Sequence, residues 1–181
     1  PAHTSPRSFA VLTERNGRAR RWPEGCVETE CLSVVSGRVK DGREETDAVA
    51  EHTIALMLSV ARRVVESDIY TRQGKYTGWG PLLFLGSELK GKKLGLLGAG
   101  RIGSRVAEIA RNGFGMEVCY YDVKENPLVE KATKAQFCAS PDMVLRDADF
   151  VSIHVPLLPS THHMINAEHL RMMKKTAYLI N

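Results

Sequence analysis

The stretch Lys93–Gly103, KLGLLGAGRIG, places three glycines at the spacing GxGxxG directly behind a short apolar run. That run, Lys93–Leu97, has the length of a buried strand. The segment that starts within the glycines, Arg101–Arg111, repeats its apolar residues at helical spacing. A second apolar run, Met116–Tyr121, then ends at Asp122. The order of strand, glycine turn, helix, strand and acid decides which fold we expect.

The remainder of the second half of the chain continues this alternation. The expected further strands are Lys134–Cys138, Asp149–His154 and Thr176–Ile180, and the expected helices are Ser140–Asp147 and one that Asn166 caps and that runs to Met173. Alternating strands and helices are typical of a parallel sheet that helices cover on both faces. The prediction is therefore an α/β protein with a Rossmann-type, doubly wound parallel sheet in three layers, which lacks its last strand or strands.

In a loop that binds a dinucleotide, each glycine of the motif has a physical role that requires glycine. Gly98 permits a tight turn, Gly100 lets a pyrophosphate approach the backbone, and Gly103 lets the helix pack closely on the strand. The helix N-terminus adds free N–H groups and a partial positive charge for the phosphates. Asp122, nineteen residues after Gly103, is expected to bond both adenosine ribose hydroxyls, which favours NAD, although Lys124 leaves NADP open. The alternative is a glycine turn without a ligand and a solvated Asp122.

The end of the fourth expected strand, His154–Pro159, supplies a second signal. Ligands of open α/β sheets lie beyond the carboxyl ends of the strands, so this segment is expected to line the nicotinamide half of the site. His154 could act as a general acid–base. We favour the interpretation that its ring and backbone shape the pocket wall. His162 and His163 are expected to be solvated, and Thr161 to fix the turn.

A long helix is expected ahead of the glycine motif. It begins at Thr46 or Asp47, and its apolar residues recur every three or four positions as far as Val65. Further apolar residues fill the positions between, so this helix is expected to pack between domains or between subunits. Gln73–Pro81 holds three glycines and is a loop. Trp79 in that loop is expected to anchor in a neighbouring groove.

The chain of 181 residues has 43% hydrophobic and 25% charged residues, as ordinary globular proteins do. Residues 1–45 are polar, and we assign them no fold. We interpret them as a remnant or a replacement of a substrate domain. Residues 46–90 are expected to form a dimerisation or hinge helix and loop, and residues 91–181 a dinucleotide-binding domain. The formal net charge is +4, with charges of both signs mixed along the chain.

Several functional classes are disfavoured by composition and pattern. A small basic cluster near the start lies beside Glu14 and Glu24, and a solvated loop is favoured over a nucleic-acid patch, so we predict no nucleic-acid partner. The cluster consists of Arg15, Arg18, Arg20 and Arg21. No apolar run reaches the ~18 residues of a membrane span, and no signal peptide is recognised, so we predict no membrane partner. The four cysteines match no zinc pattern, so they are expected to be reduced cytosolic thiols and no metal site is predicted.

With these residues in hand, the chain resembles the D-isomer-specific 2-hydroxyacid dehydrogenases, among them glyoxylate, hydroxypyruvate and phosphoglycerate dehydrogenases. The matching segments are Asp47–Ala61, Trp79–Leu94, Gly95–Ile109, Tyr120–Asp122 and His154–Asn166. Their order and spacing are specific, and they extend over roughly residues 46–181. The resemblance implies a cytoplasmic homodimer that uses NAD to transfer hydride between the cofactor and a small 2-hydroxy acid or 2-oxo acid.

The resemblance also implies roles for individual residues. In that family the glycine motif cradles the pyrophosphate, an acid holds the ribose, and the Val-Pro segment borders the cofactor. The expected cofactor-binding residues are Gly98, Gly100, Arg101, Ile102, Gly103, Asp122, His154, Val155 and Pro156. The helix Asp47–Ala61 and the loop around Trp79 correspond to a dimerisation region.

The family's catalytic residues have no counterparts that we recognise. They are an Arg that binds the substrate carboxylate, a His that acts as acid–base, and a Glu that orients the His. The Arg belongs to a TARG-type motif expected just beyond Asn181, and the Glu and His lie further on. We therefore predict no catalytic residue here and expect this chain alone to be inactive. Two alternatives stay open: a non-catalytic, co-repressor-like interaction protein that binds a dinucleotide, and an inactive gene fragment.

Overall fold

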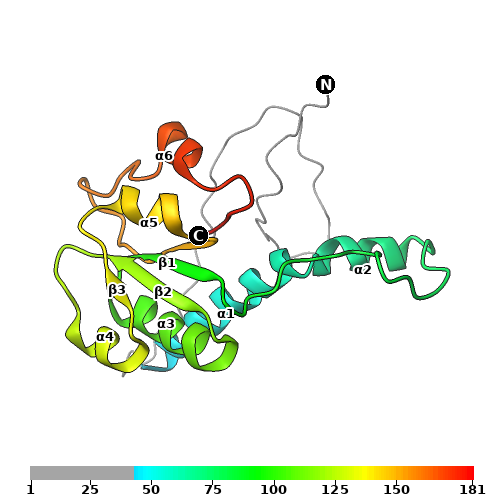
Figure 1. The fold of residues 1–181 in the computed structure, drawn as a ribbon, viewed down its shortest axis with the longest axis horizontal. Helices are drawn as coiled ribbons and strands as arrows, with labels where there is room; N and C mark the ends of the chain where they lie inside the picture. Colours follow the sequence, from blue (N-terminus) through cyan, green and yellow to red (C-terminus); the bar gives the residue numbers. More distant parts are fainter. Residues whose placement is uncertain (1–42) are drawn as a thin grey trace.

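The computed structural model describes residues 43–181 and contains a five-stranded parallel sheet in the order β3-β2-β1-β4-β5 (Figure 1). The strands are β1 (Lys93–Leu97), β2 (Glu117–Tyr121), β3 (Gln136–Phe137), β4 (Phe150–Ile153) and β5 (Tyr178–Ile180). The register aligns Leu97 with Tyr121 on one side and with Ile153 on the other. This order matches five strands of the doubly wound 3-2-1-4-5-6 arrangement, which confirms the predicted fold class.

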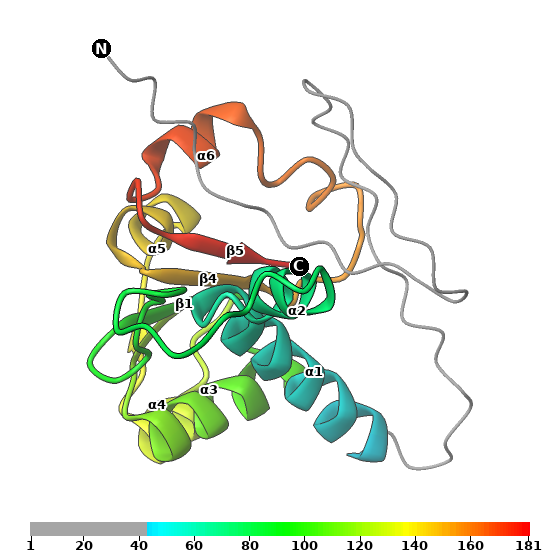
Figure 2. The same cartoon turned by 90° about the vertical axis from the view of Figure 1, so that its right-hand side faces the viewer.

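Helices cover both faces of the sheet, as the alternating pattern predicted. They are α1 (Arg43–Ala61), α2 (Val64–Arg72), α3 (Arg101–Phe114), α4 (Pro127–Thr133), α5 (Pro141–Asp147) and α6 (Ala167–Met172). Figure 2 shows α1, α3 and α4 on one side of the sheet and α5 and α6 on the other. The predicted three layers are therefore present. No helix within residues 43–181 is long and apolar enough to cross a membrane.

The core forms where the central strands meet the helices of both layers. Leu94, Leu96 and Leu97 of β1 are fully buried. Gly95 lies under α5, where an added Cβ would come within 2.5 Å of the Val144 side chain. On the other face, Met57 of α1 belongs to the same buried cluster as β1 and α3. Helix α1 is thus part of the core of the sheet domain.

The first helix differs from the prediction at both ends. It starts at Arg43, so Thr46 and Asp47 lie inside it and neither is its N-cap. Asp47 instead accepts a hydrogen bond from Arg105 of α3 at 2.6 Å. The helix does not continue to Val65, because Arg63 adopts a left-handed conformation with φ of 56° and begins a separate helix, α2. Apolar spacing alone gives no sign of this break.

Helix α2 and the loop after it form an arm, residues 64–86, that extends away from the sheet (Figure 1). None of the residues of α2 is buried. Trp79, predicted to lie in a loop, does so, but it is 83% exposed: it lines the rim of an open groove on the arm and is not anchored in a groove of another part of residues 43–181. The predicted segments before residue 43, including the arginine cluster and Cys26 and Cys31, lie outside the described residues.

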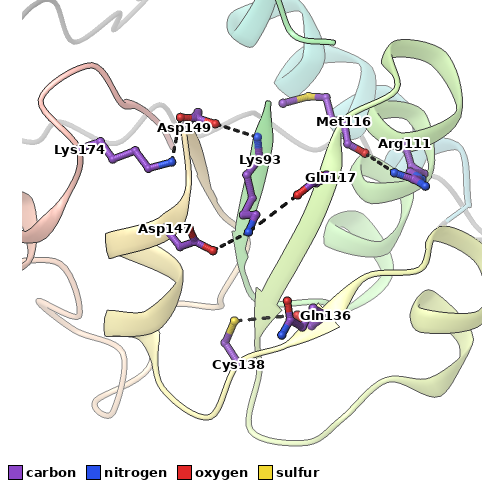
Figure 3. A network of polar contacts seen from close by, with 9 residues as sticks. All are labelled: Lys93, Arg111, Met116, Glu117, Gln136, Cys138, Asp147, Asp149 and Lys174. Atoms are coloured by element: carbon purple, nitrogen blue, oxygen red, sulfur yellow. Dashed lines mark hydrogen bonds and ion pairs between the residues drawn. The ribbon is translucent and has the colours of Figure 1, made fainter. Parts of the chain in front are cut away.

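Charged side chains connect the amino ends of the strands through hydrogen bonds and ion pairs (Figure 3). The Lys93 ammonium lies 2.6 Å from the Asp147 carboxylate and 3.9 Å from that of Glu117. Asp149 accepts the Lys93 backbone N–H at 2.9 Å and the Lys174 ammonium at 3.0 Å. Burial opposes ionisation of Asp149, but these two hydrogen bonds outweigh it and hold the pKa of the carboxyl below its usual value.

Candidate functional site

The glycine loop and the end of β4 lie side by side at the carboxyl edge of the sheet. The His154 N–H donates to the Leu97 carbonyl at 2.7 Å, and the Gly98 N–H donates to the Tyr121 carbonyl at 2.8 Å. The first residues after β1, β2 and β4 therefore converge at one edge. This is the edge at which open α/β sheets bind their ligands.

The three glycines of the loop differ in what surrounds them. Gly98 has φ of +98°, and a Cβ there would lie 2.7 Å from the His154 carbonyl oxygen. A Cβ on Gly103 would lie 2.1 Å from the Gly98 carbonyl oxygen, so the close approach of α3 to the loop requires glycine. A Cβ on Gly100 would meet no atom within 4 Å. The chain's own packing explains two of the glycines and leaves open space at the third.

Helix α3 begins at this open space without a side-chain cap. Gly100 is its N-cap, no side chain accepts a hydrogen bond there, and the first turn contains no acidic residue. Arg101 is exposed, whereas the Ile102 side chain packs against the buried core. The N–H groups of the first turn of a helix have no partners within the helix. These groups and the positive end of the helix dipole suit an anion such as a pyrophosphate.

Asp122 lies at the end of β2 and contacts the glycine loop directly. One carboxylate oxygen accepts the Ala99 N–H at 2.8 Å, and the other accepts the Val123 N–H at 2.7 Å. The spacing from the glycines predicts that this acid binds a ribose, and it gives no sign of the bond to Ala99. Each carboxylate oxygen has a further lone pair that can accept a hydroxyl.

Asn126, which no sequence pattern marks as a site residue, also contacts the loop. Its side-chain N–H₂ donates to the Ala99 carbonyl at 2.7 Å, and its side-chain oxygen accepts the Val129 N–H at 3.4 Å, which caps α4. The pair Asn126-Pro127 is the ordinary signal of an N-cap followed by proline at the first helical position. That signal could have revealed α4, a helix that was not predicted. It could not have revealed the bond to Ala99.

His154 is held in place by its neighbour on the strand. Its Nε2 lies 2.9 Å from Oγ of the buried Ser152. Burial lowers the pKa of His154 to about 4, so the imidazole is neutral near pH 7. A general acid works best with a pKa near the operating pH. This environment therefore favours the pocket-wall interpretation of His154 over the acid–base one.

The loop after His154 is fixed by one threonine, as predicted. Thr161 Oγ1 donates to the Pro156 carbonyl at 2.5 Å and accepts the Leu158 N–H at 2.8 Å. Val155 is half-buried and Pro156 is exposed. The two histidines that follow, His162 and His163, are exposed, as predicted. Residues 43–181 bring no three His, Cys, Asp or Glu side chains together in the way a metal site requires.

A parallel sheet in this strand order, with a crowded glycine turn, an uncapped helix start and an acid on the next strand, defines a dinucleotide-binding α/β domain. Residues 54–181 match the family model of the D-isomer specific 2-hydroxyacid dehydrogenase NAD binding domain. The chain belongs to this family, and residues 54–181 are its NAD-binding domain.

Similar proteins include several enzymes of known class. The glyoxylate reductase of Aeropyrum pernix is 49% identical over 140 residues, which cover 75% of this chain and 41% of that enzyme. The glycerate dehydrogenase of Cucumis sativus is 41% identical over 151 residues, covering 75% of this chain and 40% of that enzyme. The D-lactate dehydrogenase from Aquifex aeolicus, solved in complex with NAD and lactic acid, is 36% identical with a TM-score of 0.68, covering 75% and 39% of the two chains. The chain thus spans about 40% of the length of these relatives.

Proposed function

We propose that this chain supplies the cofactor half of an NAD-dependent oxidoreductase that transfers hydride between NAD(H) and a small 2-hydroxy acid or 2-oxo acid. The observation that carries the proposal is the open space at Gly100, within a loop whose other two glycines are enclosed by the chain itself. Bound NAD supplies the hydride donor or acceptor. The protein's part is to hold the cofactor and fix its orientation.

Different residues of the site contact different parts of the cofactor. The backbone of Gly98, Gly100, Arg101, Ile102 and Gly103 faces the pyrophosphate at the start of α3. Asp122 accepts hydrogen bonds from the adenosine ribose hydroxyls, through the carboxylate lone pairs that do not accept the Ala99 and Val123 N–H groups. The segment from His154 through Val155 to Pro156 borders the nicotinamide half, where the neutral imidazole forms part of the wall.

Reduction of a 2-oxo acid places negative charge on the carbonyl oxygen, which needs a cation and a proton donor. The pKa of His154 is lowered to about 4, so its imidazole is neutral near pH 7 and we do not assign it as the proton donor. Arg171 is exposed on α6, the helix that follows the turn fixed by Thr161, and we do not assign it as the cation. We assign no catalytic residue among residues 43–181. The substrate class is proposed from the relatives, since their names describe enzymes of small hydroxy and oxo acids.

Substitution of Gly100 tests the proposal. The backbone there has φ of −71°, which any residue adopts, so Gly100→Ala should change stability by no more than about 1 kcal/mol, the loss of a glycine N-cap. Gly100→Ser keeps a good N-cap and adds the same Cβ. Both variants should weaken NADH binding, followed by fluorescence titration, at least about tenfold, because the Cβ occupies the space of the pyrophosphate. NADH affinity equal to that of the parent would refute the proposal.

We also propose that residues 46–90 form the dimerisation region of a homodimer, with the arm as its main contact. Trp79, Leu82 and Leu85 are 83%, 78% and 61% exposed, a large apolar surface for a monomer. Trp79 also lines an open groove on the arm together with Tyr70, Tyr76 and Phe84. A second copy of the arm would cover the exposed residues and the groove, and its own groove would be the neighbouring groove in which Trp79 is predicted to anchor.

Two equally exposed leucines provide the test. Leu82→Arg places a charge on the arm, whereas Leu128→Arg places the same charge on α4, where the leucine is 80% exposed. Light scattering after gel filtration should show a dimer for the parent and for Leu128→Arg, and a monomer for Leu82→Arg. A monomeric parent, or a dimeric Leu82→Arg, would contradict the proposed interface.

We propose a cytoplasmic location for the protein. Cys119 and Cys138 are buried free thiols, which are typical of a reducing compartment. Fractionation of cells that produce the protein from its own gene should recover it with the cytosolic markers. Recovery in a membrane, secreted or organellar fraction would contradict this assignment.

A further inference from the structure

The Ala99 residue inside the glycine motif is held on both of its backbone groups by side chains. Its N–H is bound by the Asp122 carboxylate at 2.8 Å. Its carbonyl accepts the Asn126 side-chain N–H₂ at 2.7 Å and the Ser104 hydroxyl at 3.0 Å. We propose that Asn126 is a positioning residue for the pyrophosphate site, because it fixes the direction of the Ala99–Gly100 peptide. This inference rests on the proposed function.

Peptide geometry connects Asn126 to the ligand side of the loop. In a planar trans peptide the carbonyl and the following N–H point in opposite directions. When Asn126 and Ser104 hold the Ala99 carbonyl on their side, the Gly100 N–H must point the other way. Gly100 has open space around its Cβ position and a permissive backbone, so little else prevents this peptide from turning over. A turned peptide would present a carbonyl oxygen to an anion.

The orientation of the Asn126 amide is itself fixed by neighbours. Its oxygen accepts the Val129 N–H as the cap of α4, which leaves the N–H₂ group for the Ala99 carbonyl. Its backbone N–H donates to the Tyr120 hydroxyl at 2.7 Å, and that hydroxyl donates to Glu130 at 2.6 Å. Burial, reinforced by Glu130, raises the pKa of Tyr120 to about 12, so the hydroxyl stays protonated as this donor.

The test uses Asn126→Ser, which is uncharged and keeps an N-cap oxygen but is too short to reach Ala99. Asn166→Ser is the matched control, because Asn166 caps α6 by accepting the Glu168 and His169 N–H groups. The probes are ADP-ribose, which contains the pyrophosphate, and adenosine, which does not. Asn126→Ser should weaken ADP-ribose binding about fivefold in calorimetry, the effect of one hydrogen bond, and change adenosine binding less than twofold. Asn166→Ser should change neither.

A ligand-free measurement separates this inference from the proposed function. In ¹⁵N relaxation-dispersion spectra of the free chain, the Gly100 amide should show microsecond-to-millisecond exchange in Asn126→Ser and not in the parent or in Asn166→Ser. A parent that binds no ADP-ribose refutes the proposed function, while the Gly100 exchange still tests whether Asn126 fixes the Ala99–Gly100 peptide. A quiet Gly100 amide in Asn126→Ser, an unchanged ADP-ribose affinity, or equal losses for ADP-ribose and adenosine would each overturn the positioning role.

Discussion

Replacement of Gly103 by alanine should lower the stability of the domain more than any other change of the same size in α3. The added Cβ would lie 2.1 Å from the Gly98 carbonyl oxygen, whereas real Cβ contacts essentially never fall below 3.0 Å. The obstacle is backbone and cannot swing aside as a flexible side chain would. The helix must therefore move from the loop by nearly 1 Å, although its face with Val106, Ala107 and Ala110 is buried against the core.

The magnitude follows from two opposing effects. Overpacking of a close contact costs up to about 3 kcal/mol, and a gap of under 1 Å already forfeits much of the dispersion energy of the surfaces that separate. Alanine is a better helix former than glycine by roughly 1 kcal/mol, which offsets part of this cost. The net loss for Gly103→Ala is about 2 kcal/mol, which lowers Tm by roughly 6 °C for a domain of this size.

Gly113 provides a control within the same helix. A Cβ there would meet no atom within 4 Å, so Gly113→Ala should raise stability by about 0.5 kcal/mol through helix propensity alone. Urea unfolding followed by far-ultraviolet circular dichroism gives both values on one scale, with unchanged m-values. If Gly103→Ala is as stable as Gly113→Ala, the close contact between Gly103 and the loop does not exist in solution and the reasoning fails.

Three further predictions concern ionisable groups. Because the folded pKa of Asp149 is lowered, its contribution to stability is complete above the ordinary value of 3.8 and is lost as the pH falls further; Asp149→Asn should lose less stability than the parent between pH 5 and pH 3 in urea titrations. The pKa of His154 is lowered from 6.5 to about 4, so the unfolded chain takes the proton first, and stability should fall as the pH drops from 6.5 toward 4; Tm measured at pH 7 and pH 5 should differ less in His154→Gln. Burial raises the pKa of Cys119 to about 12 and also raises that of Cys138, so peptide mapping after a short iodoacetamide pulse at pH 8 should find both unmodified until urea unfolds the chain.

The strands and the glycine loop could be predicted because their signals are local. Apolar runs of strand length, a glycine turn and a following helix are all written within a few neighbouring residues. The interruption between α1 and α2 is different. The Ala61 carbonyl at the end of α1 accepts the Ser87 N–H at 2.8 Å, and Gly86 packs against that same carbonyl. Ser87 lies 26 residues after Ala61, so the local apolar spacing, which continues to Val65, wrongly predicts one uninterrupted helix.

The contacts around Ala99 show the same limit at the site. Sequence reasoning selected Asp122 for its spacing from the glycines, and the structure places it at the loop. Whether its carboxylate turns toward a ligand or toward the Ala99 N–H depends on side-chain geometry across 23 residues. Asn126 lies 27 residues from Ala99 and carries only a helix-cap signal. Sequence patterns identify such residues only as turn or cap residues. Their hydrogen bonds in the structure are needed to show that they also hold Ala99.

The glycine motif therefore contains two kinds of information that the sequence cannot separate. Gly98 and Gly103 are required by contacts with His154 and with the loop itself, so a fold of this type needs them whether or not it binds anything. Gly100 has no such requirement, and its neighbour Ala99 is held by three side-chain contacts that keep the loop in one conformation. A loop fixed in advance loses less conformational entropy when a ligand binds. The case for a cofactor thus depends on Gly100 and the groups around Ala99 far more than on the count of glycines.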